Sequence, residues 1–272
     1  MQLEGEKSGR LERCLKDLHL PTVRRCYQDE AINARRDNWD YETYLYELAV
    51  RECEDRQNKR IARLLRDSKL PLEKSLQAFD RKRLPRKLDT QLALLLRGDF
   101  LSHRENVLAF GNPGSGKTHL LCAIAQELIH QGRHIRFMPC NLLVQELLIA
   151  KRDLKLARVL KQYGKFEALI IDDIGYVQQS REEMEVLFTL LADRYERSSV
   201  MITSNLPFSK WEQIFKDPMT TAAAIDRLVH HSVILELNLS SYRLEQSRKT
   251  KEAGSVQLLQ ADPPEQKMDS RS

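Results

Sequence analysis

Apolar residues in the amino-terminal quarter of the chain recur at helical spacing. Leu11, Leu15 and Leu18 predict a short amphipathic helix that ends before Pro21, and a second helix is expected over 22–36. Asp40 is a suitable N-cap for a third helix, whose apolar positions lie three and four residues apart and stop before Pro71. These positions are Tyr41, Tyr44, Leu45, Leu48, Ile61, Leu64 and Leu65. We therefore predict a helical domain over residues 1–70.

The rhythm changes after residue 88, where short apolar segments alternate with longer helical stretches. This alternation predicts an α/β domain over 88–245 with a mainly parallel sheet of five strands, covered by helices on both faces. The strands are expected at 106–110, 134–138, 168–172, 199–203 and 232–237.

Two further segments lack such periodicity. Residues 71–87 contain Pro71, Pro85 and a run of basic residues, and we interpret them as a basic linker. Residues 246–272 are polar and aperiodic, which is typical of a disordered tail.

Composition limits the class of protein. The chain has 272 residues, of which 42% are hydrophobic and 31% charged, so a sizeable core is possible. No apolar run approaches the ~18 residues of a membrane span, and the first residues lack the apolar stretch of a secretory signal. Five cysteines without a close pair argue against a disulfide framework and a zinc cluster. We expect a soluble cytoplasmic protein with no membrane partner.

The net charge of +5 is unevenly distributed. Twelve basic and three acidic residues lie between Arg56 and Lys87, which gives this stretch +9 and leaves about −4 for the rest. Two sets stand out there: a basic ladder at helical spacing (Arg56, Lys59, Arg60, Arg63 and Arg66) and a basic run (Arg81, Lys82 and Arg83). Such a concentration is typical of a contact with the phosphate backbone of nucleic acid. The alternative is a solvated helix face.

One segment fits G-x-x-x-x-G-K-[ST], the phosphate-binding loop (P-loop) pattern. It follows the strand at 106–110, precedes an apolar helix, and consists of Gly111, Asn112, Pro113, Gly114, Ser115, Gly116, Lys117 and Thr118. Backbone N–H groups of such a loop bind phosphates at a helix N-terminus. Lys117 would neutralise the β- and γ-phosphates, and the Thr118 hydroxyl would bind Mg²⁺. We predict binding of a nucleoside triphosphate with Mg²⁺, the alternative being a flexible glycine-rich turn.

Two acidic residues follow the buried strand at 168–171. Asp172 is expected to hold Mg²⁺, directly or through water, and Asp173 to orient or deprotonate the attacking water. The alternative is that both carboxylates cap the element after the strand.

Asn205 and Arg227 complete the candidate machinery for hydrolysis. Asn205 follows the strand at 199–203, where its amide is placed to touch the γ-phosphate or the attacking water; the alternative is an ordinary turn residue before Pro207. Arg227 lies in an apolar helical stretch, where it either pairs within the chain, for instance near Asp226, or reaches the γ-phosphate bound to a neighbouring subunit. His230 and His231 have no partners at metal-ligand spacing.

Taken together, these motifs resemble the IstB-like ATP-binding proteins, the ATPase helper subunits of bacterial insertion sequences. That family is related to DnaC-type helicase loaders within the AAA+ superfamily. The resemblance rests on GNPGSGKTHL, ALIIDDIGY, RYERSSVMITSNLPFSKWEQIF, AIDRLVHH and the closing SYR, and it extends over roughly residues 10–245.

The resemblance implies an AAA+ core in which the strand at 199–203 lies between the P-loop strand and the Asp172 strand. Lys117 and Thr118 then belong to Walker A, Asp172 and Asp173 to Walker B, and Asn205 is sensor 1. Arg227 matches the arginine-finger position, which implies ATP sites shared between subunits of a homo-oligomer. Arg243 is placed to contact nucleotide. Many AAA+ proteins have Glu where this chain has Asp173, and the shorter acid is consistent with slow or partner-dependent turnover.

The resemblance further implies ATP-dependent assembly on duplex DNA, largely independent of sequence, and recruitment of a cognate transposase. Two other functions stay open. A DnaC-type replicative helicase loader shares the ATPase core but acts on a helicase and single strands, and it needs a docking surface in the helical domain. A small-molecule P-loop kinase explains the loop but neither the basic helical domain nor Arg227.

Overall fold

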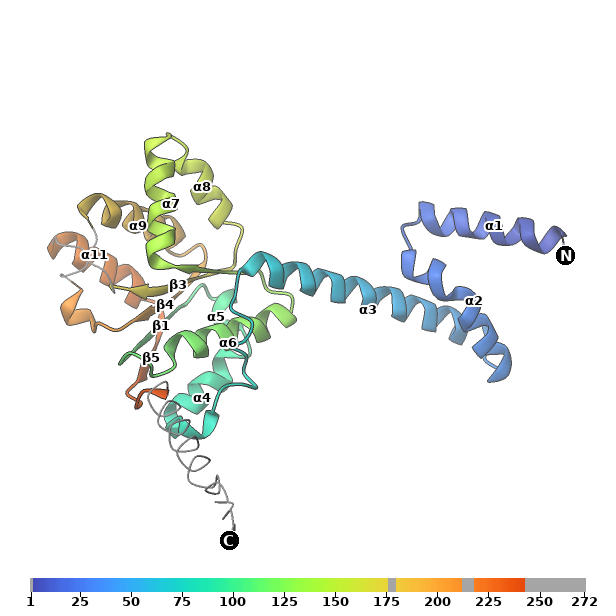
Figure 1. The fold of residues 1–272 in the computed structure, drawn as a ribbon, viewed down its shortest axis with the longest axis horizontal. Coiled ribbons are helices and arrows are strands. Elements are labelled where there is room, and N and C mark those ends of the chain that lie inside the picture. The colour runs from blue at the N-terminus through green and yellow to red at the C-terminus, as the bar shows by residue number, and fades with distance from the viewer. Residues whose placement is uncertain (1, 176–179, 212–217, 243–272) are drawn as a thin grey trace, which may run out of the picture. The chain divides into compact units, whose positions relative to one another are not determined.

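The computed structural model describes residues 2–175, 180–211 and 218–242 (Figure 1). The chain divides into two compact units, residues 1–67 and 68–272. No helix in these described ranges is long and apolar enough to cross a membrane. The segment interpreted as a disordered tail lies outside the described residues.

The first unit contains the three helices that the apolar spacing predicts. They are α1 (Gln2–Asp17), α2 (Pro21–Arg36) and α3 (Tyr41–Ser68). Pro21 begins α2, where its fixed φ suits the first helical position and its missing N–H costs no hydrogen bond. A small apolar core forms where Leu15, Val23 and Leu48 meet, one from each helix.

Glu52 of α3 replaces the missing side-chain cap of α2. Its side chain is buried, and Oε2 accepts the backbone N–H groups of Thr22 and Val23 at 2.8 and 3.1 Å. Arg56, one turn further along α3, donates to Oε1 at 2.9 Å. This carboxylate therefore satisfies two N–H groups that the first turn of any helix leaves unpaired.

The second unit is built on a parallel sheet of five strands in the order β2-β3-β4-β1-β5. The strands are β1 (Asn106–Gly111), β2 (Ile135–Pro139), β3 (Ala168–Ile174), β4 (Ser199–Ser204) and β5 (Ser232–Leu237). All five predicted strands are confirmed, with ends that differ by at most two residues. The expected position of β4 between β1 and β3 is also confirmed. Residues 168–171 are fully buried, which explains their continuous apolar run.

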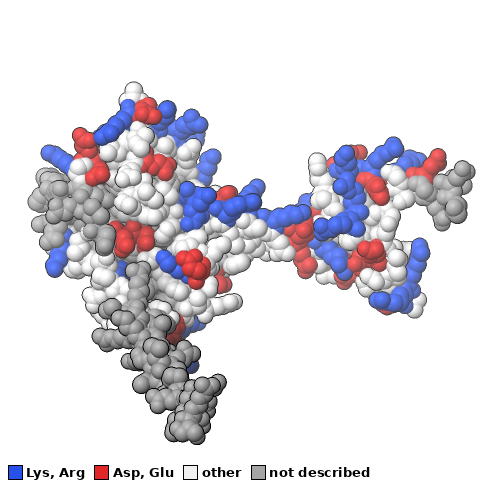
Figure 2. Space-filling view, viewed as in Figure 1, with Lys and Arg blue, Asp and Glu red and all other residues white. Residues whose placement is uncertain are grey.

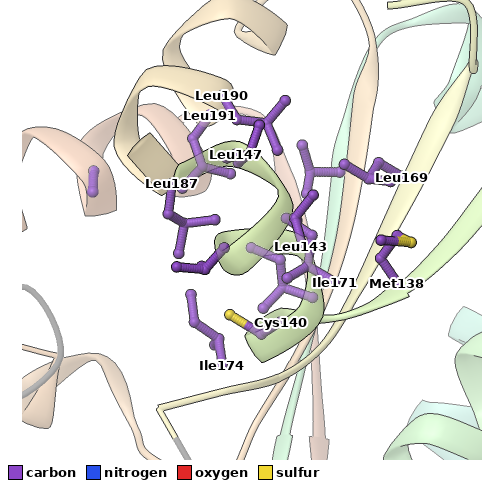
Figure 3. Close-up of a cluster of buried hydrophobic side chains, with 14 of the residues drawn as sticks. Met138, Cys140, Leu143, Leu147, Leu169, Ile171, Ile174, Leu187, Leu190 and Leu191 are labelled. Atoms are coloured by element: carbon purple, nitrogen blue, oxygen red, sulfur yellow. The ribbon is translucent and has the colours of Figure 1, made fainter. Parts of the chain in front are cut away.

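Helices cover both faces of this sheet (Figure 1). Those of the second unit are α4 (Arg86–Leu95), α5 (Asp99–Ser102), α6 (Lys117–His130), α7 (Cys140–Arg152), α8 (Leu156–Tyr163), α9 (Arg181–Arg194) and α11 (Pro218–Val229), with 3-10 turns η1 (Arg81–Arg83) and η2 (Phe208–Lys210). On one face, leucines of α7 and α9 pack against β3, as Figure 3 shows for Leu143, Leu187, Leu169 and Ile171. Helix α6 lies on the other face.

Residues 71–83, which we call the strap, pack along α6. Gln126 of α6 is buried, and its Nε2 donates to the carbonyl oxygens of Pro71, Leu72 and Lys74 at 3.2–3.3 Å. The predicted linker over 71–87 is thus part of the second unit, and its last residues begin α4. The prolines and basic residues of this segment predicted a linker, whereas the Gln126 side chain of α6 holds its first residues by hydrogen bonds.

Candidate nucleotide site

The P-loop lies at the carboxyl end of β1, and α6 begins at Lys117. Gly114 and Gly116 both have positive φ, +79° and +98°, a conformation that L side chains rarely adopt. A Cβ at Gly114 would also collide with Ser241, and one at Gly116 would lie 3.3 Å from the Phe79 ring of the strap. Both glycines are therefore required by backbone conformation and by close neighbours.

Lys117 joins the P-loop to the end of β4. Its amine donates to the carbonyl oxygens of Gly111 and Asn112 at 2.8 and 3.0 Å, and to Asn205 Oδ1 at 2.6 Å. The Lys117 side chain is buried. The structure thus brings together Lys117 and Asn205, which the sequence placed in separate motifs.

The two predicted Mg²⁺ ligands are also neighbours. Thr118 Oγ1 donates to Asp172 Oδ1 at 2.7 Å. A hydroxyl and a carboxylate are the hard oxygen donors that Mg²⁺ prefers, so these side chains fit the ion.

Thr203 of β4 is a site residue that sequence reasoning missed. Its buried hydroxyl donates to Asp172 Oδ1 at 2.7 Å and accepts the backbone N–H of Asp173 at 2.8 Å. The pairing of β3 with β4 shifts between Ile171 and Ile174, and Asp173 has a φ of +60°. Thr203 therefore holds an irregular turn of backbone at Asp173, whose side chain is exposed and lines the cavity described next. The signal in the sequence was a polar residue inside an apolar strand.

A cavity of about 290 Å³ connects these groups. Residues from the strap, the P-loop, the ends of β3 and β4 and the segment after β5 line it, among them Lys74, Phe79, Arg83, Lys117, Asp173, Asn205 and Tyr242. Residues predicted to bind phosphate, to hold Mg²⁺ and to orient water thus line one cavity, together with the aromatic rings of Phe79 and Tyr242.

Arg83 lies in this cavity wall, although the sequence suggested a DNA contact. Its Nη2 donates to the carbonyl and hydroxyl oxygens of Ser240 at 2.9 and 3.2 Å, and its guanidinium lies over the Tyr242 ring. Arg81 pairs with Asp89 at 2.6 Å, and Lys82 is exposed. The basic run is therefore divided between the nucleotide cavity and solvent. Arg243 lies outside the described residues.

Arg227 lies at the opposite end of the sheet. Its guanidinium stacks over the Phe188 ring at 4.8 Å, and its Nη1 is buried without a hydrogen-bond partner among the described residues. The salt bridge between Arg227 and Asp226, which the sequence suggested as an alternative, is not found among the described residues. A cavity of about 260 Å³ surrounds it, which we call the Arg227 cavity; its lining is His103, Arg104, Asn106, Tyr195, Glu196, Arg227 and His231.

The two histidines after α11 lie close to a carboxylate from another segment. Candidate ligand atoms of Glu196, His230 and His231 are within 4.8 Å of one another. The sequence showed no metal-ligand spacing because Glu196 is brought there by the fold.

The basic ladder lies on exposed positions of α3, and Figure 2 shows Lys and Arg side chains along this helix. Arg56 and Lys59 are paired one turn back with Glu52 and Asp55, at 2.9 and 2.5 Å. Arg60, Arg63 and Arg66 make no ion pair within the described residues. The ladder therefore consists of two compensated cations followed by three uncompensated ones.

The sequence of this chain is similar to a known family and to individual proteins of bacterial insertion sequences. A family model described as IstB-like ATP binding protein matches residues 13–250. A putative insertion sequence ATP-binding protein of Sinorhizobium fredii is 40% identical over 244 residues, covering 89% of this chain and 82% of the relative. The insertion sequence IS5376 putative ATP-binding protein of Geobacillus stearothermophilus is 35% identical over 235 residues, covering 86% and 94%.

Solved structures share the fold at lower identity. The crystal structure of DnaI has a TM-score of 0.52 at 22% identity, over 62% of this chain and 94% of that one. AMPPCP-bound DnaA from Aquifex aeolicus has a TM-score of 0.53 at 18% identity, over 68% and 56%. These likenesses show an α/β AAA+ P-loop fold and nothing further.

Proposed function

This chain belongs to the family of IstB-like ATP-binding proteins, and on that premise we propose that it is an AAA+ ATPase regulating DNA transposition. The resemblance derived from the motifs is confirmed, and the chain is an insertion-sequence-associated ATP-binding protein. The proposal adds three steps: ATP with Mg²⁺ is bound and hydrolysed, the ATP form assembles on duplex DNA with little sequence preference, and the assembly recruits the cognate transposase.

One observation carries the hydrolysis step: Lys117, Thr118 and Asn205 line a single cavity, and Thr118 donates a hydrogen bond to Asp172. Thr118 and Asp172 would hold Mg²⁺, which supplies charge neutralisation between the phosphates. Lys117 binds phosphate oxygens, and Asp173, exposed at the cavity edge, orients or deprotonates the attacking water.

The position of Arg227 supports hydrolysis between subunits. Asn106 begins β1 in the Arg227 cavity, and Gly111 ends β1 at the P-loop, about 17 Å away for five steps of a strand. That separation prevents Arg227 from reaching the phosphates of its own chain. A second copy, arranged head to tail, can receive it.

The direct test is mass-resolved assembly on a duplex with ATP and with ADP, at low and moderate salt. The proposal expects multimers on DNA with ATP only, and an Arg227→Ala protein that binds nucleotide but does not hydrolyse it. Normal turnover by Arg227→Ala would refute the role in trans.

Absence of duplex binding in both nucleotide states would favour the second candidate, a helicase loader. The fold that this chain shares with DnaI and with the DnaC helicase loader supports that candidate. The DnaC structure has a TM-score of 0.50 at 17% identity, over 60% of this chain and 96% of that one. The three uncompensated cations of the basic ladder support direct contact with DNA instead.

A further inference from the structure

We propose that Glu196, His230 and His231 form a binding site for a transition-metal ion of the Zn²⁺ class. Their candidate ligand atoms lie within 4.8 Å of one another, and all three residues are exposed. Glu196 precedes β4 and the two histidines precede β5, so the cluster lies at the amino ends of these strands. The P-loop lies at the carboxyl end of β1. The site is therefore separate from the nucleotide site, and the inference goes beyond the proposed function.

Asn106, the first residue of β1, holds the backbone around the cluster. Its buried side chain accepts the N–H of Val200 in β4 at 2.9 Å and donates to the Leu228 oxygen of α11 at 3.2 Å. Its own backbone N–H donates to the His231 oxygen at 2.7 Å. Because β1 lies between β4 and β5, these bonds fix the turn before β4 relative to the turn before β5. The sheet thus determines how far the carboxylate lies from the imidazoles.

Contacts outside the cluster orient two of the three side chains or their backbone. Glu196 has a φ of +56°, and its backbone oxygen accepts Arg104 Nη1 at 2.7 Å. Its carboxylate makes no ion pair with a described residue and is available to a metal. The Tyr195 hydroxyl lies 3.3 Å from His230 Nδ1, a hydrogen bond that sets the orientation of this ring. Metal-binding imidazoles usually have such a partner outside the ligand set.

The spacing of the cluster suits a small ion. Zn²⁺ bonds of about 2.0–2.1 Å place neighbouring ligand atoms roughly 3.3 Å apart in a tetrahedral site. Because the three side chains are exposed, rotation about their own bonds can bring the atoms to that separation without moving the backbone. A water molecule would complete the coordination, as it does in other sites with three protein ligands.

The donor set selects the class of ion. Two imidazoles and one carboxylate suit Zn²⁺ and its neighbours Co²⁺ and Ni²⁺, whereas Mg²⁺ and Ca²⁺ require oxygen ligands. Arg104 and Arg227 line the cavity that Glu196 and His231 also line, and their charges oppose an ion held mainly by electrostatic attraction. An ion bound through nitrogen lone pairs is therefore favoured over a hard cation.

Metal titration of the full chain tests the site. Nucleotide and Mg²⁺ are left out, so that Thr118 and Asp172 are not loaded. Zn²⁺ competing with a chromophoric chelator should bind at about one tight equivalent per chain. Co²⁺ should give the visible d–d absorption of a low-coordinate nitrogen and oxygen site, and either ion should raise the midpoint of thermal unfolding.

Variants assign the ligands. Glu196→Gln, and a double variant with His230→Gln and His231→Gln, should each bind Zn²⁺ at least ~10-fold more weakly and lose the thermal shift. His103→Gln is the matched control, because His103 lines the same cavity but lies outside the cluster, and it should bind Zn²⁺ as the wild type does. All three replaced ligands are exposed, so without metal the variants should unfold at the wild-type temperature.

Two results would overturn the inference. The first is equal Zn²⁺ affinity in the control, in Glu196→Gln and in the double histidine variant. The second is a sulfur-to-cobalt charge-transfer band in the near ultraviolet that persists in these variants. That band would assign the bound metal to cysteines, of which Cys14 and Cys53 are exposed.

Discussion

The amine of Lys117 donates a hydrogen bond to Asn205 Oδ1 over 2.6 Å, although the two residues are 88 positions apart. The same amine donates to two P-loop carbonyl oxygens. An ammonium has three N–H donors, so a phosphate oxygen must displace at least one of these partners. Because Asn205 is a side chain at the edge of the cavity, it is the partner that can move.

The first prediction concerns Asn205. Asn205→Ala should lower turnover by about 10- to 100-fold, because an amide that positions the phosphate or water is lost. Its affinity for ATP should change little, since removing Asn205 also removes a competitor for Lys117. Steady-state turnover and titration with a fluorescent ATP analogue measure the two effects. Lys117→Ala serves as the comparison, because it should lose affinity for ATP. An equal loss of ATP affinity in both variants would contradict the prediction that Asn205 is displaced from Lys117 when phosphate binds.

The second prediction concerns Thr203. Thr203→Val keeps the shape of the side chain but removes the donor to Asp172 and the acceptor for Asp173 N–H. A hydrogen bond to a charged group contributes about 1.5–3 kcal/mol, so kcat should fall by roughly 10- to 100-fold and more Mg²⁺ should be needed for half-maximal rate. Thr203→Ser should retain most activity. Equal rates for the Val and Ser variants would show that the hydroxyl has no positioning role.

These two residues illustrate what the sequence could predict. The apolar runs predicted the five strands, because buried parallel strands are apolar on both faces. The P-loop pattern placed Lys117 and Thr118, because their spacing along the chain fixes their geometry. Thr203 was missed because threonine is common in strands, and only the strand order brings its hydroxyl between Asp172 and Asp173.

The strap was missed for a related reason. Pro71, Pro85 and the basic residues of 71–87 are typical of a linker, whereas the strap is held by hydrogen bonds from Gln126, more than fifty positions away. Contacts across such separations leave no periodic signal in the sequence. Glu196 reached the histidines after α11 in the same way.

The third prediction separates two roles for Arg83. Because Arg83 lies in the wall of the nucleotide cavity, Arg83→Ala should weaken ATP binding by several-fold, about 1 kcal/mol for a lost hydrogen bond. Duplex binding at saturating ATP should keep its salt dependence. Lys82→Ala, an exposed neighbour in the same 3-10 turn, is the control and should leave ATP affinity unchanged. Titrations of both variants with nucleotide and with DNA decide between a nucleotide contact and a DNA contact.

The fourth prediction concerns acid stability of the first unit. Burial raises the pKa of Glu52, but the N–H groups of Val23 and Thr22 and the Arg56 guanidinium outweigh it, so the pKa is lowered overall. Because the pKa of Glu52 is lower in the folded than in the unfolded protein, its carboxylate stabilises the fold at pH values above about 4.3, the ordinary pKa of Glu. This stability is lost as the pH falls through the pKa that Glu52 has in the folded protein.

Glu52→Gln should therefore cost about 1–3 kcal/mol of unfolding free energy at neutral pH and flatten the acid dependence. Trp39 lies between α2 and α3, and Trp211 is the other tryptophan of the chain. Urea unfolding between pH 7 and acid conditions, followed by the fluorescence of Trp39 in a Trp211→Phe background, measures both effects. Identical acid profiles for the variant and the wild type would exclude Glu52 as the titrating group.

The last prediction uses the division within the basic ladder. Neutralising ~6 phosphates gives a log–log salt slope near −5 for the wild-type protein on duplex DNA. Arg60, Arg63 and Arg66 lack carboxylate partners within the described residues, so replacing all three with Ala should make the slope shallower by about 2.7 and weaken binding at low salt. Lys59→Ala should change the slope far less, because Asp55 already compensates that charge at 2.5 Å. Fluorescence anisotropy over a salt series measures both. A triple variant with the wild-type slope would mean that this face of α3 is only solvated, and the duplex contact would then have to lie elsewhere on the chain.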